Sequence, residues 1–145
     1  YNEPFYRRTI KLNIGYATAP PADKALLVKG RNLATGLPVR IEIKAEEVHE
    51  ALEESLNVIC DTVQATIEKA PPELASDIMD RGMILVGGGA QIRNLDTLLR
   101  KNISIPVMVA EDPATCVVRG TGLALEEMTI MRQVARSQRS INHLG

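Results

Sequence analysis

The spacing of apolar residues in the first half of the chain predicts a helix, a β-hairpin and a long second helix. Apolar residues recur every four positions through residues 3–14 and then meet Gly15, which predicts a short helix with a stop. Apolar runs at 25–30 and 39–43, the second strictly alternating, predict two strands of an antiparallel hairpin. From Ala45 to about Ala70 apolar residues step by three or four, so one apolar stripe is expected to cover that hairpin.

The second half of the chain changes to a pattern of alternating strands and helices. After a short helix at 73–80, the continuous apolar run at 83–86 predicts a strand that is buried on both faces. A helix beginning near Ile92, a strand at 107–109 and a helical region from Ala114 are expected to follow. The chain is therefore predicted to contain two structural units, and the polar residues 137–145 are expected to form a disordered tail.

Length and charge narrow the possible functions. The 145 residues are 45% apolar, as in an ordinary globular domain, and 17 basic against 18 acidic side chains leave a formal charge of -1. Such a balance gives no strong field toward DNA, RNA or an anionic bilayer, so no nucleic-acid partner is predicted. No apolar run approaches the roughly 18 residues of a spanning helix. The chain starts at Tyr1 rather than methionine, so a fragment of a longer protein is expected.

The cysteines and histidines offer little chemistry. Cys60 and Cys116 lie far apart in apolar surroundings, without ligand spacing, and are expected to be buried reduced thiols. His49 is predicted on the outer face of the long helix, and His143 lies in the tail. Neither histidine has a partner at catalytic spacing, so neither is assigned a role.

The segment with most functional information is Val86-Gly87-Gly88-Gly89-Ala90, between the predicted buried strand and a helix. Residues without Cβ atoms can turn sharply and let backbone amides approach a ligand, and a helix N-terminus directly after them favours a negative group. A nucleotide would fit that arrangement, although a tight structural turn explains the three glycines equally well. Neither the dinucleotide pattern nor the Walker lysine is present.

Several longer segments carry a resemblance to a known family. Residues 83–99, 105–107 and 110–125 resemble, in order, the adenosine motif and the second connecting motif of the MreB family of bacterial actin homologues. Residues 28–38 and 69–75 resemble the same family, and the similarity extends over roughly residues 10–127.

This resemblance implies an α/β fold: a partial second lobe of an actin-like (ribonuclease H-like) ATPase, with a small antiparallel sheet subdomain packed on long helices. In that fold two lobes clamp ATP and Mg²⁺. Residues 1–70 would be the upper subdomain of the second lobe, and 71–127 the C-terminal part of its lower, nucleotide-binding subdomain. Residues 128–145 would form a C-terminal helix or tail that crosses toward the first lobe.

The resemblance also implies site residues. Those expected to border the nucleotide are Gly87, Gly88, Gly89, Ala90 and Gln91. Lys11 matches the lysine of a Glu-x-x-Lys pair near the ribose and adenine, whereas Arg8 stands where the glutamate is expected. No catalytic residue or metal ligand is assigned, because Mg²⁺ would be held mainly by the missing N-terminal lobe. The full-length family is a weak ATPase, and half of the clamp is expected to be inactive.

The function implied is that of an ATP-binding cytoskeletal subunit that polymerises into filaments and directs cell shape with the cell-wall elongation machinery. The location implied is cytoplasmic, with membrane association in the full-length family but no membrane contact evident in this segment. Arg132, Arg136 and Arg139 are expected to contact the first lobe. Two alternatives are a small-molecule kinase of the same superfamily and a non-catalytic scaffold. Segments 30–38 and 112–122 fit the bacterial actins and not those kinases.

Overall fold

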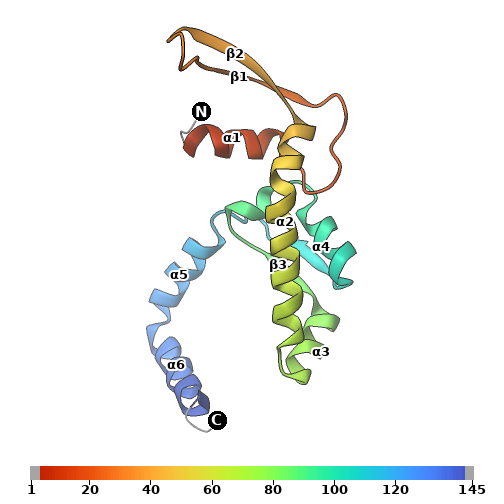
Figure 1. The fold of residues 1–145 in the computed structure, drawn as a ribbon. Helices are drawn as coiled ribbons and strands as arrows, with labels where there is room; N and C mark the ends of the chain where they lie inside the picture. Colours follow the sequence, from red (N-terminus) through yellow and green to blue (C-terminus); the bar gives the residue numbers. More distant parts are fainter. Residues whose placement is uncertain (1–3, 143–145) are drawn as a thin grey trace.

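The computed structural model describes the backbone of residues 4–142 and the side chains of residues 7–136. The described chain consists of helices and two pairs of strands (Figure 1). In order, the elements are α1 (Pro4–Ile14), β1 (Ala25–Arg31), β2 (Pro38–Lys44), α2 (Ala45–Glu68), α3 (Pro72–Arg81), β3 (Met83–Leu85), the 3₁₀ helix η1 (Gly88–Gln91), α4 (Leu95–Ile103), β4 (Val107–Val109), α5 (Cys116–Glu126) and α6 (Met128–Asn142).

The upper part of the molecule is the hairpin with α1 and the first turns of α2. β1 and β2 pair antiparallel in the register Val28↔Ile41, which confirms the predicted hairpin. Its turn is held by the Asn32 side chain, whose Oδ1 accepts the amide of Ala34 at 2.8 Å. The buried side chains at this end come from α1 and α2 and pack into one cluster: Ile14, Ala45 and Val48. The partly buried residues around them come from both helices, the loop after α1 and the hairpin: Ile10, Tyr16, Leu26, Ile43 and Leu52.

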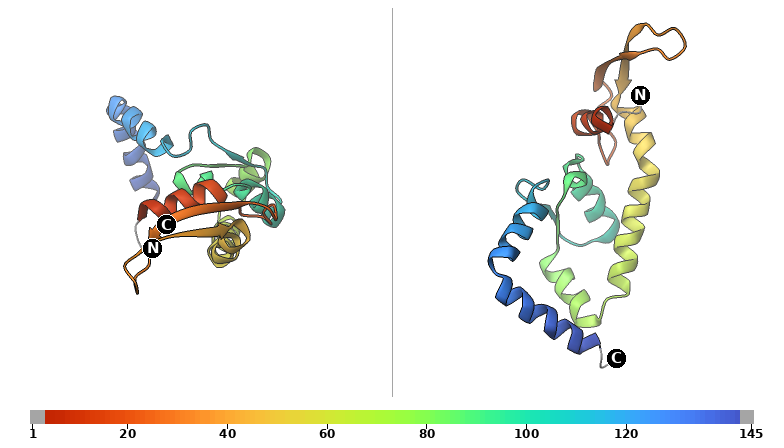
Figure 2. Two further views of the ribbon diagram at one scale, coloured as in Figure 1. Left: turned by 90° about the horizontal axis from the view of Figure 1, so that it is seen from above. Right: turned by 90° about the vertical axis from the view of Figure 1, so that its left-hand side faces the viewer.

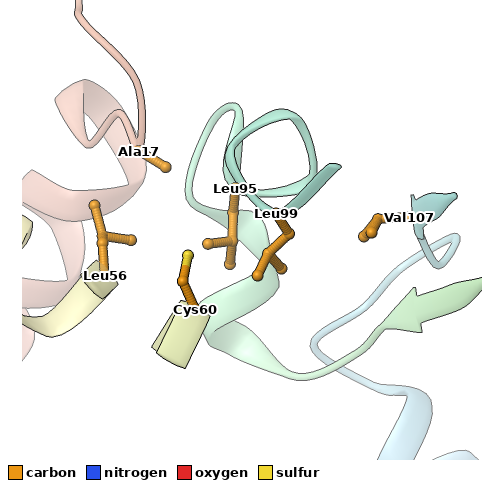
Figure 3. Close-up of a cluster of buried hydrophobic side chains, with 6 residues drawn as sticks. All are labelled: Ala17, Leu56, Cys60, Leu95, Leu99 and Val107. Carbon is orange, nitrogen blue, oxygen red and sulfur yellow. The ribbon is translucent and has the colours of Figure 1, made fainter. Parts of the chain in front are cut away.

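Helix α2 connects the upper and lower parts. Its 24 residues would extend about 36 Å at 1.5 Å per residue, and Leu52 packs against the buried clusters at both ends. The lower cluster gathers side chains from α2, α4, β4 and the loop after α1 (Figure 3), namely Ala17, Leu56, Cys60, Leu95, Leu99 and Val107. A single apolar stripe on one long helix therefore contacts both parts, whereas its spacing alone had suggested only a cover for the hairpin.

The lower part is built on two short parallel strands. β3 and β4 pair in the register Ile84↔Met108, with η1 and α4 forming the connection between them. Gly82, at φ 80°, ends α3 and leads directly into β3, where the amide of Met83 donates to the Pro106 carbonyl at 2.8 Å. The loop that leaves β3 at its C-terminal end carries the glycine run.

Two expectations for this region were wrong. Residues 83–86 are not buried on both faces: Ile84 is 63% exposed and its partner Met108 60%. The sheet has only two strands, and nothing in the described part of the chain covers that face. No α-helix follows the glycines directly, because η1 intervenes and α4 begins at Leu95, after Asn94 in the left-handed region.

The C-terminal helices form an arm. Figure 1 shows α5 and α6 apart from α2 and α4, and the right-hand view of Figure 2 shows β3 and α4 between α2 and α5. The expected disorder of the tail is wrong for residues 137–142, which continue α6, and residues 143–145 lie outside the described residues. Apolar side chains of the arm that are exposed are Val117, Val118, Leu123, Leu125, Met128, Ile130, Met131 and Val134. No described helix is long and apolar enough to cross a membrane.

The predicted environments of two other residues also need correction. Cys60 is a buried free thiol as expected, but Cys116 is only half-buried, because it begins α5, a helix with no buried residue. His49 does not lie on the outer face of α2. It is half-buried, and its Nδ1 lies 2.9 Å from the Tyr16 carbonyl oxygen, because the loop after α1 folds against that side of the helix.

Candidate functional site

A cleft of about 270 Å³ opens between α1 and the glycine run. Its lining comes from two parts of the chain that lie far apart in sequence, α1 and the segment from η1 to Ile92. The lining residues are Arg8, Lys11, Leu12, Gly88, Gly89 and Ile92. The structure therefore brings four of the predicted site residues together around one hollow.

The wall formed by α1 carries the positive charge. Arg8, Lys11 and Leu12 are spaced by three and four residues, so they share one face of the helix. Both cationic side chains are exposed, and the described residues provide no ion-pair partner for either of them. No acidic side chain lines the cleft. The electrostatics of this wall therefore favour an anionic ligand.

The opposite wall is the glycine run, whose three residues have different roles. Gly87 has φ 89° and ψ 170°, a conformation that is essentially restricted to glycine. Its amide donates to the Pro113 carbonyl at 2.6 Å, and its own carbonyl accepts the Ala90 amide at 3.2 Å. Gly87 thus makes the turn that follows β3 and is tied into the surrounding backbone.

Gly88 and Gly89 do not need to be glycine for backbone reasons. Neither has a positive φ, and a Cβ atom added to either would meet no atom of the chain within 4 Å. Their amides begin η1 and find no backbone acceptor in the described residues. Both residues line the cleft, and no atom of the described chain fills the space where their side chains would be.

The remaining predicted residues lie behind this wall. Ala90 is 6% exposed and belongs to the buried side chains, and Gln91 is half-buried. Oε1 of Gln91 is buried and finds no hydrogen-bond partner in the described part of the chain. Gly87, Ala90 and Gln91 therefore do not line the cleft, although they shape the segment that does.

Two other hollows lack this combination of features. A groove of about 570 Å³ between α1, β2 and α2 is larger, but its lining is mainly apolar and includes Ile10, Ile43 and Val48. A pocket of about 220 Å³ contains His49, Glu53 and Lys101, so its charges are mixed. Within residues 4–142, no group of three or more His, Cys, Asp or Glu side chains could hold a metal ion. The cleft at the glycine run is therefore the best candidate site.

Sequence reasoning did not assign three residues of this region to the site: Leu12 and Ile92, which line the cleft, and Arg93. The Arg93 side chain reaches across to α1, where Nη1 donates to the Leu12 carbonyl at 2.7 Å. The two residues are 81 positions apart, and no local pattern marks the arginine. Only the position of Arg93, four residues after Gly89, could have drawn attention to it.

Known proteins resemble this chain over most of its length. The family model described as MreB/Mbl protein matches residues 6–133. The cell shape-determining protein MreB of Escherichia coli strain K12 is 52% identical over 117 residues, which are 81% of this chain and 34% of that protein. The cell shape-determining protein Mbl of Bacillus subtilis strain 168 is 41% identical over 119 residues, 82% of this chain and 36% of that protein. The chain thus spans about a third of the length of these curated relatives.

Solved structures show the same relationship. The crystal structure of MreB5 of Spiroplasma citri bound to ADP matches with a TM-score of 0.73 and 34% identity, over 88% of this chain and 38% of that one. The structure of the same protein bound to AMPPNP matches with a TM-score of 0.72 and 33% identity, over 89% and 38% of the two chains. These matches confirm the predicted partial actin-like α/β fold. The chain belongs to the MreB/Mbl family.

Proposed function

We propose that the chain is part of a bacterial actin-like cytoskeletal protein and that the cleft between α1 and the glycine run binds ATP. The observation that carries the proposal is the meeting, in one cleft, of two unpaired cationic side chains and two glycines open to the solvent: Arg8 and Lys11 with Gly88 and Gly89. Membership of the MreB/Mbl family supports the choice of ligand, since MreB5 of Spiroplasma citri was crystallised with ADP and with AMPPNP.

The chemistry of the cleft suits the anionic and polar parts of a nucleotide. Unpaired backbone amides and cationic side chains are the usual donors to phosphate and ribose oxygens. Leu12 and Ile92 add apolar surface on which a base can rest. In this assignment Gly88 and Gly89 allow close approach of the ligand, while Gly87, Ala90 and Gln91 support the loop from behind.

Arg8 changes the expected ribose contact. A glutamate at this position would accept hydrogen bonds from ribose hydroxyls, whereas a guanidinium can only donate. We assign Arg8 and Lys11 together to negatively charged or acceptor oxygens of the ligand. The lining does not fit Mg²⁺, because it offers two cations and no carboxylate, so we assign the metal to residues outside this cleft. No catalytic group is assigned, and we expect no ATPase turnover from this chain alone.

The proposal extends to assembly. A protein of this family would self-associate head to tail in protofilaments and act on cell shape with the wall-elongation machinery, in the cytoplasm and at the membrane. The exposed apolar side chains of α5 and α6 support the proposal that this arm packs against another part of the longer protein. Residues 1–70, 71–127 and 128–145 would then be the upper subdomain, the lower subdomain and the tail that reaches the first lobe.

Titration of the chain with radiolabelled ATP tests the binding proposal. We expect saturable binding that weakens about fivefold or more in Lys11→Ala and in Arg8→Ala, because each variant loses a charge-assisted contact. Lys29→Ala is the matched control, since Lys29 is an exposed cation on β1 outside the cleft lining. A chain that folds but binds no ATP would favour the non-catalytic scaffold instead.

A further inference from the structure

Arg93 joins the two walls of the cleft. It follows Ile92, which lines the glycine side, and its Nη1 donates at 2.7 Å to the carbonyl of Leu12, which lines the α1 side. Its backbone adds a parallel bridge to the chain just beyond α1, where the Arg93 amide donates to Gly15 at 3.3 Å and the Arg93 carbonyl accepts from Ala17 at 2.8 Å. The link is therefore made by both main chain and side chain.

The side-chain part of this link has a clear physical basis. Leu12 supplies one of the last four carbonyls of α1, which have no amide partner within the helix. A guanidinium is well suited to that position, because it donates strongly and its charge complements the negative end of the helix dipole. The guanidinium carbon of Arg93 also lies 5.5 Å from the centre of the Tyr16 ring, a cation–π contact that fixes the direction of the side chain.

We infer that Arg93 is a positioning residue of the cleft: it sets the distance between the helix that carries Arg8 and Lys11 and the wall formed by Gly88 and Gly89. Arg93 is not among the residues that line the cleft, so it acts through α1 and not through the ligand. This inference rests on the proposed function, since the distance matters only if a ligand touches both walls.

A double-mutant cycle on ATP affinity tests the inference in the whole chain. Arg93→Ala removes the bond to Leu12 and the contact with Tyr16. It is expected to weaken ATP binding about tenfold, because ATP would then have to order α1 without the help of that charged hydrogen bond. If Arg93 acts by holding α1 in position, Lys11 should contribute less to ATP affinity in the Arg93→Ala variant than in the unaltered chain. The double variant Arg93→Ala/Lys11→Ala should therefore lose clearly less affinity than the product of the two single losses.

Val107→Ala is the matched control. Val107 is 1% exposed in the lower cluster and is not part of the cleft lining, so this variant lowers stability without touching the link. Its effect and that of Lys11→Ala should multiply, because the two sites are independent. Arg93→Lys provides a second variant, which retains a cation at the end of α1 and should keep part of the affinity and of the coupling.

The outcomes separate the two proposals. If the unaltered chain binds ATP and the Arg93 and Lys11 losses multiply, or if Arg93→Ala binds as tightly as the unaltered chain, the positioning role is refuted and the proposed function stands. If the unaltered chain does not bind ATP, the proposed function fails and this inference fails with it. Should Arg93→Ala not fold, the same cycle with Arg93→Lys decides, and multiplicative losses there again refute the role.

Discussion

The three glycines of the run should respond differently to alanine. At Gly87, with φ 89° and ψ 170°, alanine forces a conformation that side chains rarely adopt, and the free energy of unfolding should fall by about 1–3 kcal/mol. At Gly88 and Gly89 the φ values are ordinary and an added Cβ meets nothing within 4 Å. Alanine there should raise the free energy of unfolding by about 0.4–1 kcal/mol, because the unfolded chain loses conformational freedom.

ATP affinity should change in the opposite direction. The Cβ atom at position 88 or 89 would occupy space that the proposed ligand uses, and overpacking a close-fitting contact costs about 1–3 kcal/mol. We therefore expect Gly88→Ala and Gly89→Ala to bind ATP about tenfold more weakly or worse, although both are at least as stable as the unaltered chain. A higher free energy of unfolding together with a lower ATP affinity would show that these two glycines serve ligand binding and not the fold.

The measurements are urea unfolding followed by circular dichroism and titration with ATP. Gly120→Ala is the control, because Gly120 lies in α5, outside the cleft lining, and a Cβ there also meets nothing within 4 Å. It should stabilise the helix by about 0.5–1 kcal/mol and leave ATP affinity unchanged. The reasoning is refuted if Gly88→Ala and Gly89→Ala retain full affinity, or if they destabilise the chain as much as Gly87→Ala.

Three further substitutions test the packing described above by urea unfolding. Gly82→Ala should destabilise the chain by about 3 kcal/mol or more, since its Cβ would clash with the Pro106 carbonyl oxygen at a positive φ of 80°. Unchanged stability would contradict the contact between β3 and β4. Leu99→Ala should cost about 2–5 kcal/mol, because Leu99 is 1% exposed, and a loss below 1 kcal/mol would contradict the lower cluster. Gln91→Met should be neutral or slightly stabilising, as Oε1 has no partner among the described residues, and a large loss would reveal a missed hydrogen bond.

Local patterns predicted the elements well because they depend on local physics. The four-residue spacing before Gly15 gave the helix α1, and the alternation at Val39–Ile43 gave β2 with a deviation of one residue at each end. The helix predicted at 73–80 is α3, which is one residue longer at each end and begins at Pro72, whose fixed φ suits a first helical position. The candidate segment could also be located, because three consecutive glycines after an apolar run are visible in the sequence.

The predictions of burial and of site contacts that were wrong or missing depend on contacts between residues far apart in the sequence. An all-apolar run such as Met83–Val86 does not reveal whether the second face is covered, and Ile84 is exposed. The spacing of apolar residues in α2 predicted His49 on the outer face of the helix. That prediction was wrong because the loop with Tyr16, which covers His49, leaves no periodic signal in the sequence. The same limit applies at the site: three identical glycines differ only in φ and in neighbouring atoms, and Arg93 is connected to α1 across 81 residues.

The central claim is that a nucleotide lies against Gly88 and Gly89, and amide chemical shifts test it most directly. In a ¹H–¹⁵N correlation spectrum of the labelled chain, saturating ATP should move the amide signals of Gly88 and Gly89. The amides of Gly36 in the hairpin turn and Gly120 in α5 should stay in place, since both lie outside the cleft lining. Saturation with ATP that leaves the signals of Gly88 and Gly89 unmoved would contradict the account.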